Sequence, residues 1–114
     1  MKIVSYNVNG IRAALTKGFA EWLKATDPDI LGLQEIKAEE SQIDRAIFED
    51  MGYNIYWYPA AKKGYSGVAI LSKIIPNHVE FGVAMPFYDD EGRIFRADFV
   101  GFCFVCAYFA AGST

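Results

Sequence analysis

Polar side chains that can bind a metal or a phosphate follow the ends of several strands predicted from this sequence. Glu35 comes directly after residues 30–34, an apolar run with the pattern of a buried strand. Asn7 and Asn9 follow an earlier predicted strand, and Tyr108 lies at the end of the last one. A carboxylate at the tip of a buried strand needs a partner, and Mg²⁺ takes oxygen ligands, often from only one or two protein carboxylates. We therefore expect Glu35 to ligate a metal, an Asn to orient a bound water or phosphate oxygen, and Tyr108 to stabilise a phosphoryl oxygen.

Each of these residues also has an ordinary structural interpretation. A Glu after a strand is often a surface residue, an Asn in that place is often a turn or helix-cap residue, and a Tyr in a strand often only packs. The two cysteines, Cys103 and Cys106, are three residues apart in a strand-like run. Residues at that spacing face opposite sides of a strand, so we interpret both as small buried hydrophobic residues rather than a disulfide or a zinc site.

Length and composition indicate one small domain over residues 1–114. The net charge is −3, so DNA binding would depend on a local basic patch or a metal ion rather than on bulk charge. The first seven residues turn polar too early for a signal peptide, and no apolar run is long enough to span a bilayer. We therefore expect no contact with a membrane and a cytoplasmic location.

The hydrophobic pattern predicts an α/β fold. Helical spacing over residues 11–25 separates two strands, 2–8 and 29–33, which we expect to pair in parallel. Ser41 and Asp44 resemble a capping box that opens a second helix ending at Gly52. Further strands are predicted at 53–58, 68–72, 79–83, 93–99 and 102–109. We expect one mixed sheet of five or six strands with two helices on one face.

The last predicted strand is apolar on both of its faces and therefore needs cover on both. Two helices account for only one face of the predicted sheet. A soluble monomer rarely tolerates an exposed apolar patch that large, so we expect the open face to form a symmetric homodimer. The residues predicted at this dimer interface are Phe95, Phe102, Phe104 and Cys106.

Four segments of the chain match a known family in order and spacing. They are KIVSYNVNGIRA at residues 2–13, GLQEIK at 32–37, GYSGV at 64–68 and EGR at 91–93. Together they resemble the exodeoxyribonuclease III and apurinic/apyrimidinic endonuclease family, within the endonuclease/exonuclease/phosphatase superfamily. The resemblance covers nearly the whole chain. It implies half of a deoxyribonuclease I-like four-layer α-β-β-α sandwich.

The resemblance also implies a Mg²⁺-dependent phosphodiesterase that acts on duplex DNA in base-excision repair. By position, Glu35 looks like the metal ligand, and Asn7 looks like the residue that positions the nucleophile and the phosphate. Asn9 stands where some relatives have a metal-linked Asp, and Tyr108 looks like the tyrosine that contacts the scissile phosphate. The positions that resemble DNA contacts are Arg12, Lys63, Tyr65 and Arg93.

The chain departs from that family in two ways. It corresponds only to the first half, so the second half's Asp-x-Asn pair and closing Asp-His have no counterpart, and His78 lies in the wrong segment to serve as base. Ala110 and Ala111 replace the proline and polar residue expected after Tyr108, which is typical of deliberate simplification. We expect a truncated, engineered half-domain that forms a dimer and has little nuclease activity. The alternatives are a nuclease that is active as a dimer, and a metal- or DNA-binding remnant.

Overall fold

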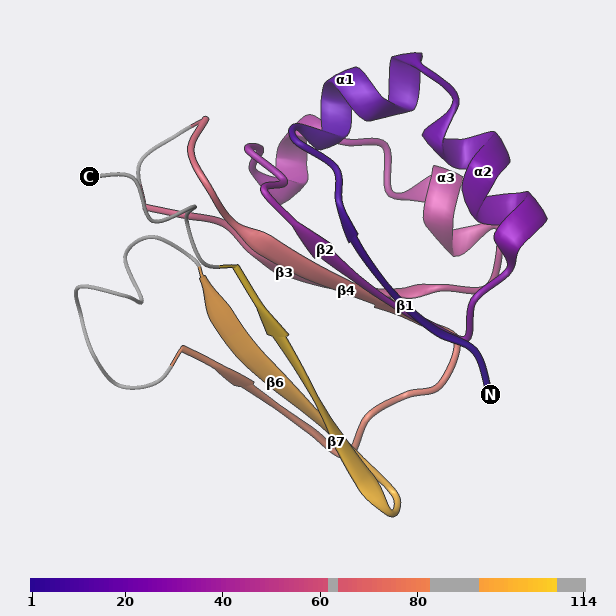
Figure 1. The fold of residues 1–114 in the computed structure, drawn as a ribbon, viewed down its shortest axis with the longest axis vertical. Helices are drawn as coiled ribbons and strands as arrows, with labels where there is room; N and C mark the ends of the chain where they lie inside the picture. Colours follow the sequence, from indigo (N-terminus) through magenta and orange to yellow (C-terminus); the bar gives the residue numbers. More distant parts are fainter. Residues whose placement is uncertain (62–63, 83–92, 109–114) are drawn as a thin grey trace.

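The computed structural model describes residues 1–61, 64–82 and 93–108, and it arranges them in three layers. One layer contains the helices α1 (Ile11–Thr16), α2 (Phe19–Thr26) and α3 (Ala46–Glu49), with the 3₁₀ turn η1 (Glu40–Gln42). The middle layer is a four-stranded sheet, and the third is a three-stranded sheet on the face away from the helices (Figure 1). The α/β class predicted from the sequence is confirmed.

The four-stranded sheet has the order β1-β2-β4-β3. Its strands are β1 (Ile3–Asn7), β2 (Ile30–Gln34), β3 (Asn54–Tyr58) and β4 (Val68–Ser72). β1 and β2 run parallel, with Asn7 beside Gln34, as the strand–helix–strand order predicts. β4 is antiparallel to both of its neighbours. The carboxyl ends of β1 and β2 therefore lie side by side at one end of the sheet, and Glu35 is the first residue after β2.

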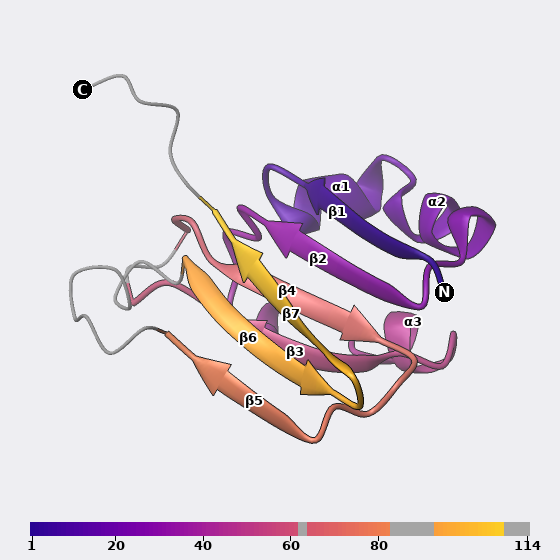
Figure 2. The ribbon, with the colours of Figure 1, turned by 60° about the horizontal axis from the view of Figure 1, so that its bottom comes forward.

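The prediction of one continuous sheet is wrong, because the later strands form a second one. β5 (His78–Phe81), β6 (Ile94–Phe99) and β7 (Phe102–Ala107) pair in sequence order as an antiparallel meander. Figure 2 shows this meander lying across the four-stranded sheet. β5 begins at His78, one residue before the strand predicted at 79–83. The strand prediction at Val83 and the end of the last predicted strand at Phe109 lie outside the described residues.

Two apolar cores hold the three layers together. The first fills the space between the helices and the four-stranded sheet and contains Leu23, Leu33, Phe48 and Leu71. The second lies between the two sheets and contains Ile30, Val68, Ile70, Phe95, Ala97, Phe99 and Cys106. This second core covers the sheet face that the sequence analysis left open.

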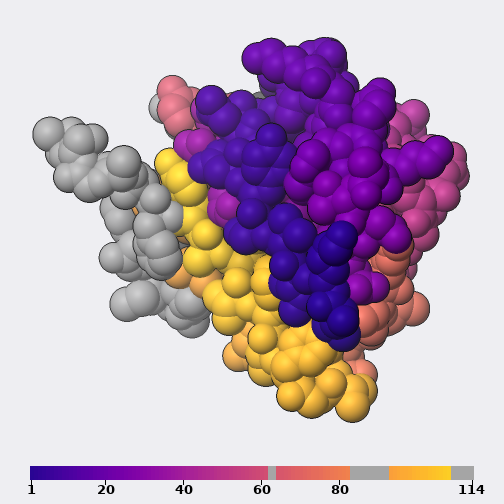
Figure 3. All heavy atoms as spheres, turned by 45° about the vertical axis from the view of Figure 1, so that its right-hand side comes forward, coloured from indigo at the N-terminus to yellow at the C-terminus, as the bar shows by residue number. Residues whose placement is uncertain are grey.

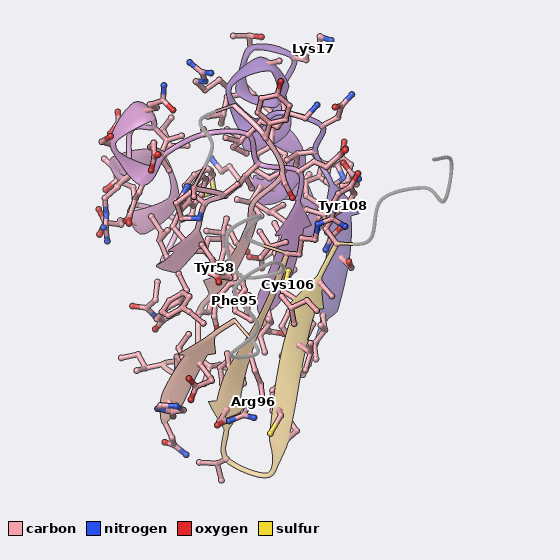
Figure 4. All side chains as sticks on the ribbon, turned by 90° about the vertical axis from the view of Figure 1, so that its left-hand side faces the viewer. Lys17, Tyr58, Phe95, Arg96, Cys106 and Tyr108 are labelled. Carbon is pink, nitrogen blue, oxygen red and sulfur yellow. The ribbon has the colours of Figure 1, made fainter. Side chains whose placement is uncertain are left out.

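The predicted dimer interface is therefore mostly internal. Phe95 is fully buried and Cys106 is 1% exposed, while Phe102 and Phe104 are partly buried against the same core. Figure 4 shows Phe95, Tyr58 and Cys106 converging between the sheets. Phe95 and Cys106 pack within one chain, so they are not available to a second copy.

The helical segments also differ from the prediction. The helix expected over residues 11–25 is two helices, because Gly18 adopts φ 102° and serves as the N-cap of α2. The capping box at η1 is made by Glu39 and Gln42, not by Ser41 and Asp44. Asp44 instead accepts a hydrogen bond from the Ala46 backbone N–H at the start of α3, at 3.1 Å. No helix among the described residues is long and apolar enough to cross a bilayer.

Candidate functional site

The residues after β1, those after β2 and those just before β4 form one bonded cluster at the end of the four-stranded sheet. The Gly10 backbone N–H donates to the Glu35 carbonyl at 2.7 Å, and the Ile11 N–H donates to the Ile36 carbonyl at 3.0 Å. The Lys37 N–H donates to the Ser66 carbonyl at 2.9 Å. These cross-links give a fixed backbone frame to the loops that follow β1 and β2 and to the loop that leads into β4.

That frame places several non-glycine residues in the left-handed region of backbone space. Asn9, Glu35, Lys37 and Ser66 have φ between 44° and 54°. An L-residue in this region costs of order 1 kcal/mol or more relative to ordinary conformations. Strained residues of this kind are found at functional sites more often than elsewhere, and here they mark the same edge that the sequence predicts.

Glu35 is half-buried, and its carboxylate contacts Tyr108. The Tyr108 hydroxyl donates to Glu35 Oε1 at 2.9 Å, joining residues far apart in the chain. This hydrogen bond, together with burial, raises the pKa of Tyr108, so the phenol stays protonated and acts as a donor. Figure 4 shows Tyr108 at one end of the second sheet, with Arg96 toward the other end.

The two asparagines are linked to each other and to Lys37. The Asn9 backbone N–H donates to Asn7 Oδ1 at 3.0 Å, and Lys37 Nζ donates to Asn9 Oδ1 at 2.8 Å. Both amides are exposed, so each has further hydrogen-bonding capacity toward solvent or a ligand. The ammonium of Lys37 repels a cation from Asn9, which makes Asn9 a weak candidate for a metal ligand.

The predicted DNA contacts have different positions relative to this cluster. The Arg93 guanidinium carbon lies 5.9 Å from the centre of the Tyr108 ring, within cation–π range. Arg12 is exposed on the first turn of α1, three residues after Asn9. Tyr65 is 57% exposed in the loop before β4. Lys63 lies outside the described residues.

The residues at this edge fit a single hard cation with few protein ligands. Among the described residues, no three or more His, Cys, Asp or Glu side chains gather in a group that could hold a metal ion. Glu35 supplies one carboxylate, and Mg²⁺ is commonly held by one or two carboxylates, with waters and substrate phosphates completing its shell.

Sequence reasoning singled out neither Gln34 nor the 66–67 turn as part of this edge. Gln34 Nε2 donates to Ser5 Oγ at 2.9 Å, joining β2 to β1, and the Ile36 N–H donates to the Gly67 carbonyl at 3.2 Å. Gln34 could have been found from the sequence, because it is a polar residue at the end of the predicted strand, next to Glu35. The 66–67 turn lies within GYSGV, one of the four segments that match the family, but its place beside Ile36 and Lys37 depends on pairing between segments far apart in the chain.

Comparison with known proteins identifies relatives that match most of this chain. A model described as the endonuclease/exonuclease/phosphatase family matches residues 4–108. An exodeoxyribonuclease of Bacillus subtilis (strain 168) is 43% identical over 100 residues, which are 87% of this chain and 38% of that protein. DNA repair nuclease APEX1 of Danio rerio is 43% identical over 110 residues, 95% of this chain and 36% of that protein. The chain thus spans less than half the length of these curated relatives.

Solved structures show the same likeness. An AP endonuclease from Archaeoglobus fulgidus superposes with a TM-score of 0.82 at 38% identity, over 95% of this chain and 40% of that one. A 3'-5' exonuclease, NExo, from Neisseria meningitidis gives a TM-score of 0.84 at 33% identity, over 98% of this chain and 43% of that one. The fold of this chain is therefore one that an AP endonuclease and a 3'-5' exonuclease also contain.

Proposed function

Since this chain belongs to the endonuclease/exonuclease/phosphatase family, we propose that it is the phosphate- and metal-binding portion of an exodeoxyribonuclease III-like DNA repair nuclease. The observation that carries the proposal is the hydrogen bond from Tyr108 to Glu35 at the shared end of β1 and β2. It places a carboxylate for a cation beside a neutral phenol that can donate to a phosphate oxygen.

The residues at this edge divide the work of holding a DNA phosphate. Glu35 ligates Mg²⁺, which when bound supplies positive charge against the phosphate oxygens. Asn7 donates from its side-chain Nδ2–H to those oxygens, and Tyr108 does so when its hydroxyl turns from Glu35 to the phosphate. Lys37 holds the Asn9 side chain at Oδ1, while the Asn9 backbone N–H donates to Asn7 Oδ1 and orients that amide. Arg12, Tyr65 and Arg93 contact the flanking DNA backbone, an electrostatic interaction that weakens as salt rises.

We propose that the described residues bind but do not hydrolyse DNA at a useful rate. Hydrolysis needs a general base within reach of the attacking water. Near the phosphate position, the described residues offer one carboxylate, that of Glu35, which the cation engages; the other groups are amides, an ammonium and a protonated phenol. His78 pairs with Glu80 on β5, in the other sheet. An engineered origin is inferred only from the sequence at Ala110 and Ala111, and it stays a proposal. Both residues lie outside the described ranges.

A Mg²⁺ titration followed by ¹H–¹⁵N NMR tests the metal site directly. We expect shifts confined to residues around Glu35, Asn7 and Tyr108, and at least about tenfold weaker binding for Glu35→Gln, since a hard cation needs the carboxylate charge. Glu49→Gln, on α3, is the matched control and keeps wild-type binding. Unchanged titration in Glu35→Gln would remove Glu35 as the metal ligand.

Duplex DNA containing an abasic site supplies the second arm of the test. At low salt we expect weak binding that Glu35→Gln and Arg12→Ala both reduce, with no cleavage above background. Mg²⁺-dependent cleavage that Glu35→Gln abolishes would instead establish this chain as a nuclease by itself and reject the proposed lack of hydrolysis.

A further inference from the structure

Gln34 lies where the candidate site meets both sheets. It is the last residue of β2, directly before Glu35, and its partner in the parallel register is Asn7. Alternate residues of a strand face the same side, so Gln34 shares a face with Ile30, which belongs to the inter-sheet core. Its side chain therefore points between the sheets, at the end where the candidate site begins. The proposed function gives this amide no role.

The side-chain amide of Gln34 connects three strands. Its Nε2 donates to Ser5 Oγ on β1 at 2.9 Å and to Cys106 Sγ on β7 at 3.7 Å. An amide nitrogen carries two N–H donors, so both bonds form at the same time. Figure 3 shows the yellow atoms of β7 close to the indigo atoms of the N-terminal strand, the two strands that this amide connects to β2.

The chemistry of the Cys106 thiol fixes the direction of the bond to β7. The thiol donates toward the Leu33 carbonyl at 3.5 Å and the Ala69 carbonyl at 3.6 Å, both in the four-stranded sheet. Burial raises the pKa of Cys106 to about 11, so its single hydrogen is retained for these carbonyls. The sulfur can then only accept from Gln34. The amide nitrogen of Gln34, rather than its oxygen, must therefore face β7.

The end of β2 and the end of β7 make two successive contacts. Gln34 contacts Cys106, and the next residue, Glu35, contacts Tyr108. Cys106 and Tyr108 are two residues apart, so their side chains face the same side. The Tyr108 N–H donates to the Arg93 carbonyl at 2.8 Å, which continues the pairing of β6 with β7 up to this residue. The bond from Gln34 is therefore the contact on which the next one, at Glu35, is built.

The left-handed backbone at Glu35 explains how two adjacent residues contact the same strand. In a regular strand Glu35 would face the helices, on the side opposite to Gln34. With φ 54° the chain leaves the strand geometry, and the carboxylate contacts Tyr108 on the second sheet instead. Gln34 is thus the last side chain that β2 itself holds in place before the candidate site.

We propose that Gln34 is a positioning residue, which holds β7 against the end of β2 through Cys106 and so keeps the Tyr108 hydroxyl within reach of Glu35. A hydrogen bond is directional, whereas apolar contacts are not and leave packed strands free to shift. The bond from Gln34 therefore sets how the two sheets meet at this end. Its consequence for phosphate binding rests on the proposed function, but the geometry that it sets does not.

The ionisation of Tyr108 reports this geometry without metal or DNA. The hydrogen bond to Glu35 raises the pKa of Tyr108, so a phenol that loses this partner should ionise at a lower pH. Gln34→Met keeps the length of the side chain and has no amide. In this variant we expect the ionisation constant of Tyr108 to rise by about threefold or more. NMR titration of protein with ¹³Cζ-labelled tyrosine measures it, and Tyr108→Phe assigns the signal.

Three further variants separate this role from a general effect on stability. Ser5→Ala removes the acceptor on β1 and should leave the ionisation of Tyr108 as in the wild type. Cys106→Ala removes the acceptor on β7 and should change Tyr108 in the same direction as Gln34→Met. Gln42→Met, in η1 on the helix side, is the matched control and should leave Tyr108 unchanged.

Two results would overturn the proposal. One is a folded Gln34→Met in which Tyr108 ionises as in the wild type. The other is an effect of Ser5→Ala as large as that of Gln34→Met, with none from Cys106→Ala. ¹H–¹⁵N spectra show which variants are folded, and if Gln34→Met is not, an unchanged Tyr108 in Cys106→Ala contradicts the proposal by itself. Failure of the proposed function appears separately, as Mg²⁺ binding that Glu35→Gln leaves unchanged.

Discussion

At the scale of single residues, the hydrogen bond from Tyr108 to Glu35 determines which groups near a phosphate can carry a proton. It raises the pKa of the phenol, so Tyr108 is a donor and not a base. On the second sheet, a carboxylate likewise raises the pKa of a thiol. Asp98 accepts a hydrogen bond from Cys103 and raises its pKa, which keeps that exposed thiol protonated and slow to react.

Replacing Asp98 should make Cys103 more reactive. In Asp98→Asn the carboxylate charge that disfavours the thiolate is gone, so the pKa of Cys103 falls and more thiolate is present at pH 8. We expect alkylation at pH 8 to be faster by roughly a factor of a few. Cys106, whose pKa burial raises to about 11, should stay unreactive in both proteins until they unfold. Mass spectrometry after timed iodoacetamide treatment measures both thiols, and an unchanged Cys103 rate would refute the role of Asp98.

At the scale of elements, the sequence predicts strands better than helices. The strand predicted at residues 68–72 has the same bounds as β4. Its short run has apolar residues on both faces, which is typical of a buried strand. The helix over 11–25 was predicted as continuous because apolar spacing continues through Lys17 and Gly18. The break there depends on a backbone conformation that periodicity does not report. The contact of Tyr108 with Glu35 was equally hidden, since it requires β7 to lie under β2.

Close approach of β7 to β2 requires the absence of a side chain at Gly32. A Cβ there would lie 3.0 Å from Cζ of Phe104 and 3.2 Å from the Cys106 sulfur. Gly32→Ala should therefore lower the free energy of unfolding by about 1–3 kcal/mol through overpacking. Adding Phe104→Leu should recover part of that loss, and urea unfolding of the two single variants and the double variant measures the coupling. Strict additivity of the two changes would show that the ring is not what opposes the added methyl.

At the scale of the whole molecule, the chain covers its own sheet. The sequence indicated that the last strand needs cover on both faces, but a strand pattern does not say which strands share a sheet. Residues 73–77 lead from β4 into a second layer, with the Asn77 N–H donating to the Asp98 carbonyl at 2.7 Å. The inter-sheet core therefore forms within one chain, and folding does not require a partner at Phe95 or Cys106.

Truncating the inter-sheet core should destabilise both sheets together. Phe95→Ala removes a fully buried ring and should cost about 3–5 kcal/mol, a large part of the stability of a small domain. Val105→Ala, on the exposed face of β7, should change stability by less than about 0.5 kcal/mol. Thermal unfolding followed by both near- and far-UV circular dichroism should show one coincident transition. Loss of the second sheet alone in Phe95→Ala would mean that the two sheets unfold as separate units.

The residues with left-handed backbone conformations at the end of the sheet should respond differently to selection for stability and to selection for binding. At Asn9, Glu35, Lys37 and Ser66 the backbone conformation is one that glycine adopts with less strain. A library enriched for heat resistance alone should therefore drift toward glycine at these four positions, erasing the carboxylate, the amide and the ammonium at the same time. A library enriched for phosphate or metal capture should keep them. The amino acids recovered at this edge would thus reveal which property had been selected.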